Sequence, residues 1–395
     1  MPERALDKDF LIVALSGRAL AASASRGGYR AVVLDLFNDL DTRACAAESV
    51  KARGTLGTGF DADDLVALSR RLAPPPAGLV YGSGLEGRPR LLARLSAGRR
   101  LFGNRADTLA RIKDPRRFFP VLKRLAIPHP ETRLDAPPDR RGWLVKRTGA
   151  AGGAHIRRAD GSPGPAAGYF QRRVRGRAVS ALFLADGRAA RVLGFSEQWS
   201  SAGPGDQPFR FGGAALPARL PAALADEITG AVERLVAVTG LLGVNSADMM
   251  VEDGGFHLLE VNPRPGATVD IFDRALGVSL FDLHVRACTG ELPRTGGRPG
   301  AAFASAIVYA DRDLVVPAWL SWPRWTADLP EAGTPIGAGG PVCTVLATGM
   351  DVDGVKAEAR RRVDEVLAAL EPGPRGHHEG TAPVLERRPG GEFRA

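Results

Sequence analysis

The sequence predicts a mixed α/β fold that begins with a parallel, Rossmann-like sheet and ends in a small β-rich module. Three observations support this prediction. Residues 10–36 run strand, glycine turn, helix, strand, which is the βαβ unit of parallel sheets. An amphipathic stretch at 221–239 leads into two strand-like runs joined by Asp253-Gly254, the turn chemistry of a hairpin. Near the C-terminus, β-type runs at 303–309 and 342–347 precede a helical stretch at 355–370.

The N-terminal unit places glycines where its strands and helices end. Gly27-Gly28 closes a helix predicted at 19–26, and a strand at 79–81 runs into Gly82-Ser83-Gly84. Glycines at the carboxyl end of a parallel strand fit a ligand crevice. The first turn, Ser16-Gly17-Arg18, lacks the G-x-G-x-x-G fingerprint of dinucleotide-binding proteins, which disfavours a dehydrogenase.

The middle of the chain alternates helical and strand-like segments. Helices are predicted at 107–111 and 118–125, and Asp114-Pro115 restarts the second one. A strand at 143–146 and a hairpin at 179–195 follow. The polar, glycine-rich segment 198–213 is interpreted as a mobile loop near a site.

Composition limits the classes of function. The 395 residues suffice for two to three domains, and the formal charge of +9 favours anionic ligands. The basic residues are interpreted as scattered and without a reader module, so nucleic acid is disfavoured as a partner. No apolar run is long enough for a membrane helix, no signal peptide is evident, and three separated cysteines suit a reducing compartment and argue against zinc. We expect a cytoplasmic protein with no membrane partner.

The hairpin near residue 250 carries a predicted metal site. Asp248 lies on its first strand, whereas Glu260 and Asn262 lie two apart on the second and therefore share a face. Two carboxylates and an amide oxygen form the hard-oxygen set that Mg²⁺ uses beside a nucleotide phosphate. Arg264 follows between two prolines that stiffen its approach. The ordinary alternative is a hairpin with solvated charges.

A second candidate feature is the strand that ends at Lys146 and the small-residue loop behind it, residues 148–155. Backbone N–H groups of such a loop can wrap phosphate oxygens. A glycine-rich loop alone is weak evidence, because most are hairpin tips. The combination of strand, lysine and loop is more specific.

Taken in order, Lys113, Lys146, the loop from Gly149, residues 171–176, Asp248 and Glu260-Val261-Asn262-Pro263-Arg264 resemble the ATP-grasp ligase superfamily. The stretches SGRALA, GSGLE and LEVNPRPG resemble the group of predicted ATP-dependent carboligases related to biotin carboxylase, seen beside one-carbon cofactor biosynthesis. The resemblance covers about residues 10 to 370 and implies an ATP-grasp fold with a pre-ATP-grasp N-terminal domain.

The resemblance also implies roles for individual residues. The cofactors would be ATP and two Mg²⁺ ions, with Mn²⁺ as a substitute. Asp248, Glu260 and Asn262 would bind the metal, with Glu260 bridging, and Arg264 would stabilise the transferring phosphoryl group. The residues that would bind the nucleotide are Lys113, Lys146, Gly149, Gly152, Gly153, His155, Gln171, Arg172 and Val174.

The implied domains are 9–104 (pre-ATP-grasp), 105–292 (ATP-grasp, with a lid subdomain at 105–170 and a metal-binding subdomain at 171–292), 300–371 (C-terminal module) and 372–395 (disordered tail). Two departures from the family pattern concern the nucleotide. Many members have a glutamate where Gln171-Arg172 stands, and Ala178 replaces a frequent ribose-binding carboxylate. How the ribose is bound therefore stays open.

The expected activity is an ATP-dependent carboxylate–amine ligase that works through an acyl phosphate and releases ADP and phosphate. Its substrates would be a small carboxylate and an amine, one of them a glutamate-like amino acid. Two alternatives remain open, namely a carboxylase that acts through carboxyphosphate and a non-catalytic ATP-binding regulator. A homodimer is also left open. Candidates for lining the acceptor pocket are Arg18, Ser83-Gly84 and the segment 198–213.

Overall fold

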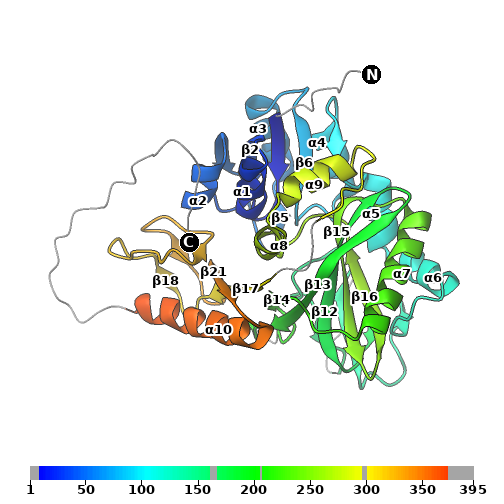
Figure 1. Cartoon of the computed structure of the whole chain (residues 1–395). Coiled ribbons are helices and arrows are strands. Elements are labelled where there is room, and N and C mark those ends of the chain that lie inside the picture. The colour runs from blue at the N-terminus through cyan, green and yellow to red at the C-terminus, as the bar shows by residue number, and fades with distance from the viewer. Residues whose placement is uncertain (1–8, 161–166, 205–206, 296–299, 372–395) are drawn as a thin grey trace.

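A computed structural model gives the fold, and it describes residues 9–160, 167–204, 207–295 and 300–371. The N-terminal unit is a five-stranded sheet in the order β3-β2-β1-β6-β7, in which every pairing is parallel, as predicted (Figure 1). Its elements are β1 (Asp9–Val13), α1 (Arg18–Arg26), β2 (Arg30–Asp35), α2 (Leu40–Cys45), β3 (Glu48–Lys51), β4 (Gly54–Thr55), β5 (Gly59–Phe60), α3 (Ala62–Leu72), β6 (Gly78–Tyr81), α4 (Pro89–Ser96) and β7 (Leu101–Phe102).

This strand order creates a crevice. The chain leaves β1 toward β2 on one side, and β6 later pairs on the other side of β1. The carboxyl ends of β1 and β6 therefore flank the point where the order reverses, which is where open parallel sheets bind ligands. The loop that follows β6 carries Gly84 and Glu86 to this point.

The next part of the chain is a lid, by which we mean α5 (Ala106–Lys113), α6 (Pro115–Arg124), β8 (Thr132–Arg133), β9 (Trp143–Arg147), β10 (Arg157–Arg158) and β11 (Gly168–Arg172). Its four strands form an antiparallel sheet in the order β10-β9-β11-β8. Asp114 caps α6 by accepting a hydrogen bond from the Arg116 backbone N–H at 3.0 Å, as the Asp114-Pro115 pair predicts.

The largest sheet has eight strands in the order β16-β15-β12-β13-β14-β17-β21-β19. The elements of this half are β12 (Arg177–Asp186), β13 (Ala190–Ser200), β14 (Phe211–Leu216), α7 (Ala222–Thr239), β15 (Leu242–Glu252), β16 (Gly255–Asn262), α8 (Val269–Leu276), α9 (Leu280–Ala287), β17 (Ala302–Tyr309), β18 (Leu314–Val315), β19 (Thr326–Ala327), β20 (Pro335–Ile336), β21 (Pro341–Gly349) and α10 (Val352–Ala369).

The C-terminal strands continue this sheet. β17 pairs with β14 and β21 pairs with β17, so the predicted C-terminal module shares one sheet with the hairpin that carries the predicted metal ligands. A strand added to β14 satisfies hydrogen-bonding groups that would otherwise form an open edge. The domain boundaries themselves stay predictions, and the predicted tail, 372–395, lies outside the described residues.

The predicted loop at 198–213 includes the ends of two strands. Gln198 and Trp199 belong to β13 and pair with Ala214 and Gly213 of β14. Only residues 201–210 connect the two strands, and 205–206 are not described. The predicted loop therefore extends three residues too far at each end, into β13 and β14.

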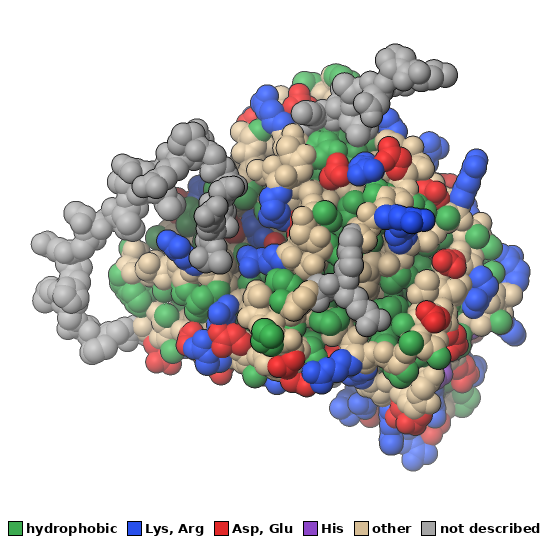
Figure 2. Space-filling model, viewed as in Figure 1, with side chains coloured by type: hydrophobic (Ala, Val, Ile, Leu, Met, Phe, Trp, Pro, Cys, Tyr) green, Lys and Arg blue, Asp and Glu red, His purple; other side chains and the backbone are tan. Residues whose placement is uncertain are grey.

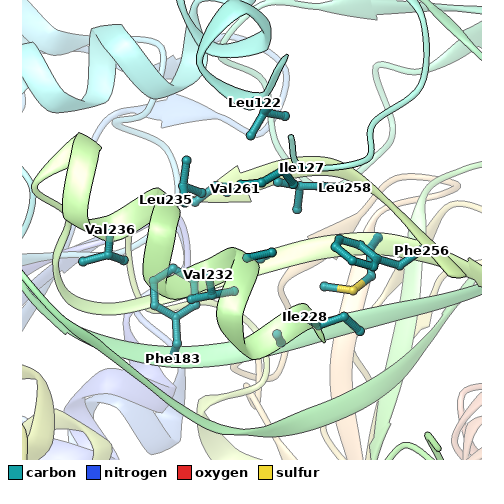
Figure 3. Packing of buried hydrophobic residues seen from close by; sticks show 14 of the residues in the cluster. Leu122, Ile127, Phe183, Ile228, Val232, Leu235, Val236, Phe256, Leu258 and Val261 are labelled. Atoms are coloured by element: carbon teal, nitrogen blue, oxygen red, sulfur yellow. The ribbon is translucent and has the colours of Figure 1, made fainter. Parts of the chain in front are cut away.

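The two faces of the large sheet have different neighbours. On one face, α7 packs Ile228, Val232 and Leu235 against Phe183 of β12, and Leu122 of α6 closes the cluster (Figure 3). On the other face, α8 and α9 pack toward the N-terminal sheet, where Phe281 contacts the ring of Phe10 at 5.2 Å. The sheet face that carries α8 and α9 becomes polar near Asp248.

The net positive charge is concentrated in residues 105–177, which comprise the lid and its connection to β12. Residues 105–177 contain eighteen Lys and Arg against six Asp and Glu, an excess of +12, so the chain's formal +9 leaves −3 for all other residues. Cationic side chains lie beside α6 at the right of Figure 2. Among the described residues, no helix is both long and apolar enough to cross a bilayer.

Candidate active site

The carboxylates of the hairpin β15–β16 meet as the sequence predicts. Asp248 and Glu260 are directly opposite each other across the two strands. Asn262 is opposite Ser246, which lies two residues before Asp248. Directly opposed residues of an antiparallel pair share a face. The turn residues Asp253 and Gly254 have φ of 48° and 78°, the two positive values that a tight hairpin turn of this kind requires.

A β-bulge sets the direction of Glu260. The register shifts between Asp248 and Met249, so that Leu259 has no partner of its own opposite β15. Leu258 and Val261 both pack into the core beneath α7. With strict alternation, a buried Leu258 would bury Glu260 as well, because residues two apart share a face. The extra residue releases Glu260 to the polar face, where it is in phase with Asn262.

Hydrogen bonds connect these groups into one network. The Lys113 ammonium at the end of α5 lies 3.2 Å from Glu260 Oε2 and 3.1 Å from Asn262 Oδ1. Asn262 Nδ2 donates to Asp248 Oδ2 at 2.8 Å. Ser180 Oγ donates to Asp248 Oδ1 at 2.6 Å, and Gln198 Nε2 approaches the same oxygen at 3.4 Å. Sequence reasoning had not singled out Ser180, which is directly opposite Asp248, whereas Gln198 begins the segment 198–213 that was predicted to line the acceptor pocket.

The donor set fits a hard divalent cation. It comprises two carboxylates and an amide oxygen, and a cationic group, the Lys113 ammonium, already lies between Glu260 and Asn262. Within the described part of the chain, no group of three or more His, Cys, Asp or Glu is arranged to hold a metal by itself. A divalent cation bound here would therefore take its third ligand from the amide of Asn262 or from a substrate oxygen.

The charges at the site are coupled. Burial by itself would raise the pKa of Glu260, but Lys113 and Lys146 outweigh it and lower that pKa to about 2. Burial, followed by the neighbouring Glu260 carboxylate, raises the pKa of Asp248. Burial lowers the pKa of Lys146, which is only 5% exposed and forms no hydrogen bond or salt bridge with any described residue. Lys146 therefore offers a buried cationic donor for an anion, with its charge partly offset by the nearby Glu260 carboxylate.

The glycine loop behind β9 is packed between two other segments. A Cβ atom at Gly149 would lie 2.6 Å from Gly87 Cα, and one at Gly153 would lie 1.9 Å from Phe209 O. The Phe211 backbone N–H donates to Gly152 O at 2.9 Å. The loop therefore touches the N-terminal unit on one side and the start of β14 on the other.

His155 ends this loop in a buried position. Its Nδ1 atom has no hydrogen-bond partner among the described residues, and burial lowers the pKa of His155 to about 4. The imidazole is therefore neutral near pH 7. A cleft lined by Lys113, Phe119, His155, Tyr169 and Glu260 separates the loop from α5 and α6.

The predicted nucleotide-binding residues Gln171 and Arg172 place their side chains on two different faces of the lid sheet. Tyr169 is opposite Lys146 and Gln171 is opposite Leu144, which places Gln171 on the Lys146 face, where its Nε2 approaches Leu259 O at 3.4 Å. Arg172 is opposite Trp143 on the other face, and its guanidinium lies 5.6 Å from the Trp143 ring. Only the backbone of Arg172 remains a candidate for contact in the cleft. Val174 follows in the connection to β12, and the structure gives it no side-chain contact that assigns a role.

Arg264 reaches the same region, and its partner comes from the N-terminal unit. Arg264 Nε donates to Glu86 Oε1 at 2.6 Å, and both side chains are buried. The Asn104 side chain donates to Pro263 O at 2.9 Å, and the Tyr81 hydroxyl lies 3.3 Å from the same oxygen. Sequence reasoning missed Glu86 as a site residue, although it stood at the end of the glycine-rich GSGLE stretch.

Arg18, a predicted acceptor-pocket residue, is engaged elsewhere. Its guanidinium forms two hydrogen bonds of 2.6 Å to Asp270 of α8 and further bonds to Asp328, and Asp41 lies 3.5 Å away. Arg18 is 5% exposed. It therefore joins the N-terminal unit to α8 and to the C-terminal strands and leaves no free donor direction for a substrate.

Comparison with known proteins identifies the central part of this architecture. Residues 112–268 match the family model "ATP-grasp domain". The curated relatives include the carbamoyl phosphate synthase large chain of Vibrio vulnificus, 25% identical over 286 residues, which are 65% of this chain and 25% of that protein. The corresponding protein of Halomonas eurihalina is 32% identical over 74 residues, 19% of this chain and 7% of that protein. The chain thus spans a quarter or less of these relatives.

Solved structures cover almost the whole chain. The biotin carboxylase domain of Hydrogenobacter thermophilus 2-oxoglutarate carboxylase, crystallised with MgADP, ADP and bicarbonate, has a TM-score of 0.70 at 13% identity and covers 90% of each chain. The biotin carboxylase domain of a single-chain bacterial carboxylase has a TM-score of 0.68 at 18% identity and covers 92% of this chain and 93% of its own. At such identities the likeness shows the fold alone.

Proposed function

We propose, from the premise that this chain contains an ATP-grasp domain within a biotin-carboxylase-like fold, that it is an ATP-dependent carboxylate–amine ligase. The reaction would form an amide through an acyl phosphate and release ADP and phosphate. One observation carries the proposal: Lys113, Lys146, Asp248, Glu260 and Asn262 converge at one place between the lid and the hairpin.

The roles of the chain's own groups follow from this convergence. Lys146 and the backbone of Gly149, Gly152 and Gly153 would hold the phosphates of ATP, with Lys113 beside them. Tyr169 and Phe119 supply apolar surface in the neighbouring cleft. Asp248, Glu260 and Asn262 would hold Mg²⁺, which when bound neutralises phosphate charge and polarises the phosphoryl group. Arg264 would stabilise the charge on the phosphoryl group during its transfer.

Activation by phosphorylation explains why this site needs no protein nucleophile. A carboxylate does not react with an amine in water, because its oxygen is a poor leaving group. The carboxylate oxygen would attack the γ-phosphorus, the bond to the ADP oxygen would break, and the amine would then displace inorganic phosphate from the acyl carbon. The proton lost by the amine leaves to solvent or to the released phosphate.

The substrates are proposed by class. The excess of positive charge on the lid favours two anionic substrates, a nucleotide and a carboxylate. We propose a glutamate-like amino acid as one partner in the amide bond, in a one-carbon cofactor pathway. The support for this pathway is the resemblance of the SGRALA, GSGLE and LEVNPRPG stretches alone.

A second candidate function is an ATP-dependent carboxylase that acts through carboxyphosphate. It is favoured by the sequence similarity to a carbamoyl phosphate synthase large chain and by the likeness of the fold to that of biotin carboxylase domains. In that case bicarbonate would take the place of the organic carboxylate, and the same phosphate and metal groups would serve.

The decisive experiment measures ADP release by the purified full-length chain with Mg²⁺ and ATP. Amino acids, one-carbon cofactor precursors and bicarbonate are added singly and in pairs. ADP formation that requires both a carboxylate and an amine, with a product heavier by the amine minus water, supports the ligase. Bicarbonate-dependent release without an organic carboxylate would replace it with the carboxylase. Tight ATP binding without turnover under every condition would contradict both and leave a nucleotide-binding regulator.

A further inference from the structure

The loop after β6 supplies a residue that belongs to the chemistry of the site although it lies in the N-terminal unit. Glu86 Oε1 accepts a hydrogen bond from Arg264 Nε, and Glu86 Oε2 accepts one from the Gly84 backbone N–H, each at 2.6 Å. The side chains of Glu86 and Arg264 are 1% and 8% exposed. We infer that Glu86 is a positioning residue that fixes the direction of Arg264, an inference that rests on the proposed function.

The ion pair with Glu86 leaves other N–H donors of the Arg264 guanidinium available. A guanidinium is planar and carries five donors in a rigid fork, so fixing its Nε edge fixes the plane of the whole group. Nη1 lies 3.3 Å from Pro265 O, and Nη2 forms no hydrogen bond with any described residue. Glu86 lies on the Nε edge, so the Nη2 N–H that points away from this edge is available for an anion.

The backbone of its own loop holds the Glu86 side chain in place. Gly84, with φ of +106°, holds the backbone in a conformation that favours glycine, and its N–H pins the second carboxylate oxygen. Burial would raise the pKa of Glu86, but Arg264 and then Lys113 outweigh it, so the pKa is lowered and the carboxylate stays charged. Glu86 thus also offsets repulsion between Arg264 and the nearby lysine.

The backbone beside Arg264 is fixed from the same unit. Asn104 and Tyr81 both bond Pro263 O, and Gly87, the neighbour of Glu86, packs against Gly149 of the glycine loop. An ion pair that only joins two units need not involve Arg264, which lies two residues after the predicted metal ligand Asn262. Such a pair exists elsewhere, between Arg26 and the buried Asp273, and it serves as the control.

The test compares Glu86→Gln, which keeps the size but removes the charge, with Asp273→Asn, which weakens an ion pair between the same two parts of the chain. Glu86→Gln is expected to lower kcat for ADP release about 10- to 100-fold while KM for ATP stays within about twofold, since misdirected catalytic groups cost rate rather than binding. Asp273→Asn is expected to keep kcat within about twofold. In the Arg264→Ala background, Glu86→Gln should cause no further loss.

A second readout does not depend on activity. The ¹H–¹⁵N resonance of Arg264 Nε, assigned by its loss in Arg264→Ala, should shift in Glu86→Gln and stay in place in Asp273→Asn. Unchanged kcat in Glu86→Gln, or an additive loss in the double variant, would overturn the inference. If Glu86→Gln does not fold, Glu86→Asp, which retains the charge but shortens the side chain, provides the same comparison. If the wild-type chain forms no ADP, the proposed function fails, and an unshifted Arg264 resonance would separately remove the role of Glu86.

Discussion

The Lys113 ammonium lies 3.2 Å from Glu260 Oε2, although the two residues are 147 positions apart in the chain. This contact joins the lid to the hairpin at the place where two carboxylates are opposed. It shows that the site already attracts a cation between Glu260 and Asn262. It also accounts for the lowered pKa of Glu260, which keeps the carboxylate ionised over the whole physiological range.

Replacing Glu260 by Ala should abolish the activity without unfolding the protein. The change removes the carboxylate opposed to Asp248, and the phosphate charge then lacks its metal, an effect worth several kcal/mol or about 1,000-fold in rate. ADP release and thermal unfolding are the measurements. Glu252→Ala, which removes an exposed carboxylate from the turn of the same hairpin, is the control and should behave like the wild type. Near-normal turnover in Glu260→Ala would remove the metal assignment.

Two adjacent glycines of the loop behind β9 should differ sharply in their response to alanine. Both have positive φ, 74° at Gly152 and 72° at Gly153, so both variants carry a similar backbone cost of about 1 kcal/mol. A Cβ at Gly152 meets nothing within 4 Å, whereas one at Gly153 would lie 1.9 Å from Phe209 O. Gly153→Ala should push the loop off β14 and raise KM for ATP at least about tenfold, the cost of one lost contact of about 1.4 kcal/mol.

Gly152→Ala measures the backbone effect alone in that comparison. Steady-state kinetics with ATP as the varied substrate would compare the two variants directly. Equal KM values in both would show that the contact between the loop and β14 has no part in nucleotide binding.

Acid should destabilise the protein through His284. Its Nδ1 accepts a hydrogen bond from the Val244 backbone N–H at 2.9 Å, so its Nε2 carries the proton and donates to Phe102 O at 3.0 Å. Burial lowers the pKa of His284 to about 4, whereas an unfolded histidine titrates near 6.5. Between these values the unfolded chain binds the extra proton, so this contribution to stability is present at pH 7 and is lost as the pH falls.

The contribution of His284 to the free energy of unfolding is expected to fall by about 2 kcal/mol between pH 7.5 and pH 5. Urea unfolding at both pH values gives the free energy of unfolding of the wild type and of His284→Asn. The difference in pH dependence between them is the contribution of His284, because all other titrating groups are common to the two proteins. A variant with the same pH dependence as the wild type would contradict the assignment. Asn retains one acceptor and one donor for Val244 and Phe102, which makes a folded variant the expected outcome.

The charge of the lid should accelerate capture of the nucleotide. Arg116 and Lys123 are exposed on α6, so reversing both to Glu removes positive field without touching the buried site. KM for ATP should rise roughly three- to tenfold at low salt, with kcat unchanged, and the difference should shrink near 0.5 M salt because screening removes it. The control is the double reversal of Arg70 and Arg71 on α3, which changes the same net charge in the N-terminal unit. An equal effect of both pairs would contradict a local role of the lid.

Much of the local structure could be predicted because the signals are short-range. The βαβ start, the Asp114 cap, the helix closed by Gly240 and the Asp253-Gly254 turn each depend on residues a few positions apart. The helix α3 was not anticipated, although its Asp61 caps it by accepting from the Asp63 and Asp64 backbone N–H groups. The segment 198–213 was predicted entirely as a loop, but its first three and last three residues belong to β13 and β14, because polar and small residues occur in strands as well as in loops.

The pairing of the two hairpin strands was predictable from the sequence, but the sheet face on which each side chain lies was only partly predictable. A period of two placed Glu260 and Asn262 on one face, as found. The same rule applied to Leu258 would have buried Glu260, and the bulge at Leu259 resolves this conflict. A bulge depends on how α7 and the two strands pack together, and the apolar run 256–261 carries no separate signal for it.

The sequence by itself determined the types of element, their order, and the set of charged and amide side chains available for chemistry, because helix periodicity, strand alternation and turn residues act over a few positions. Only the tertiary structure decided which of those side chains meet. Glu86 and Arg264 are 178 residues apart, and Arg18 faces Asp270 across 252 residues. Such contacts depend on how sheets and helices pack in three dimensions, so Arg18 became a link between parts of the chain while Glu86 came to lie against the site.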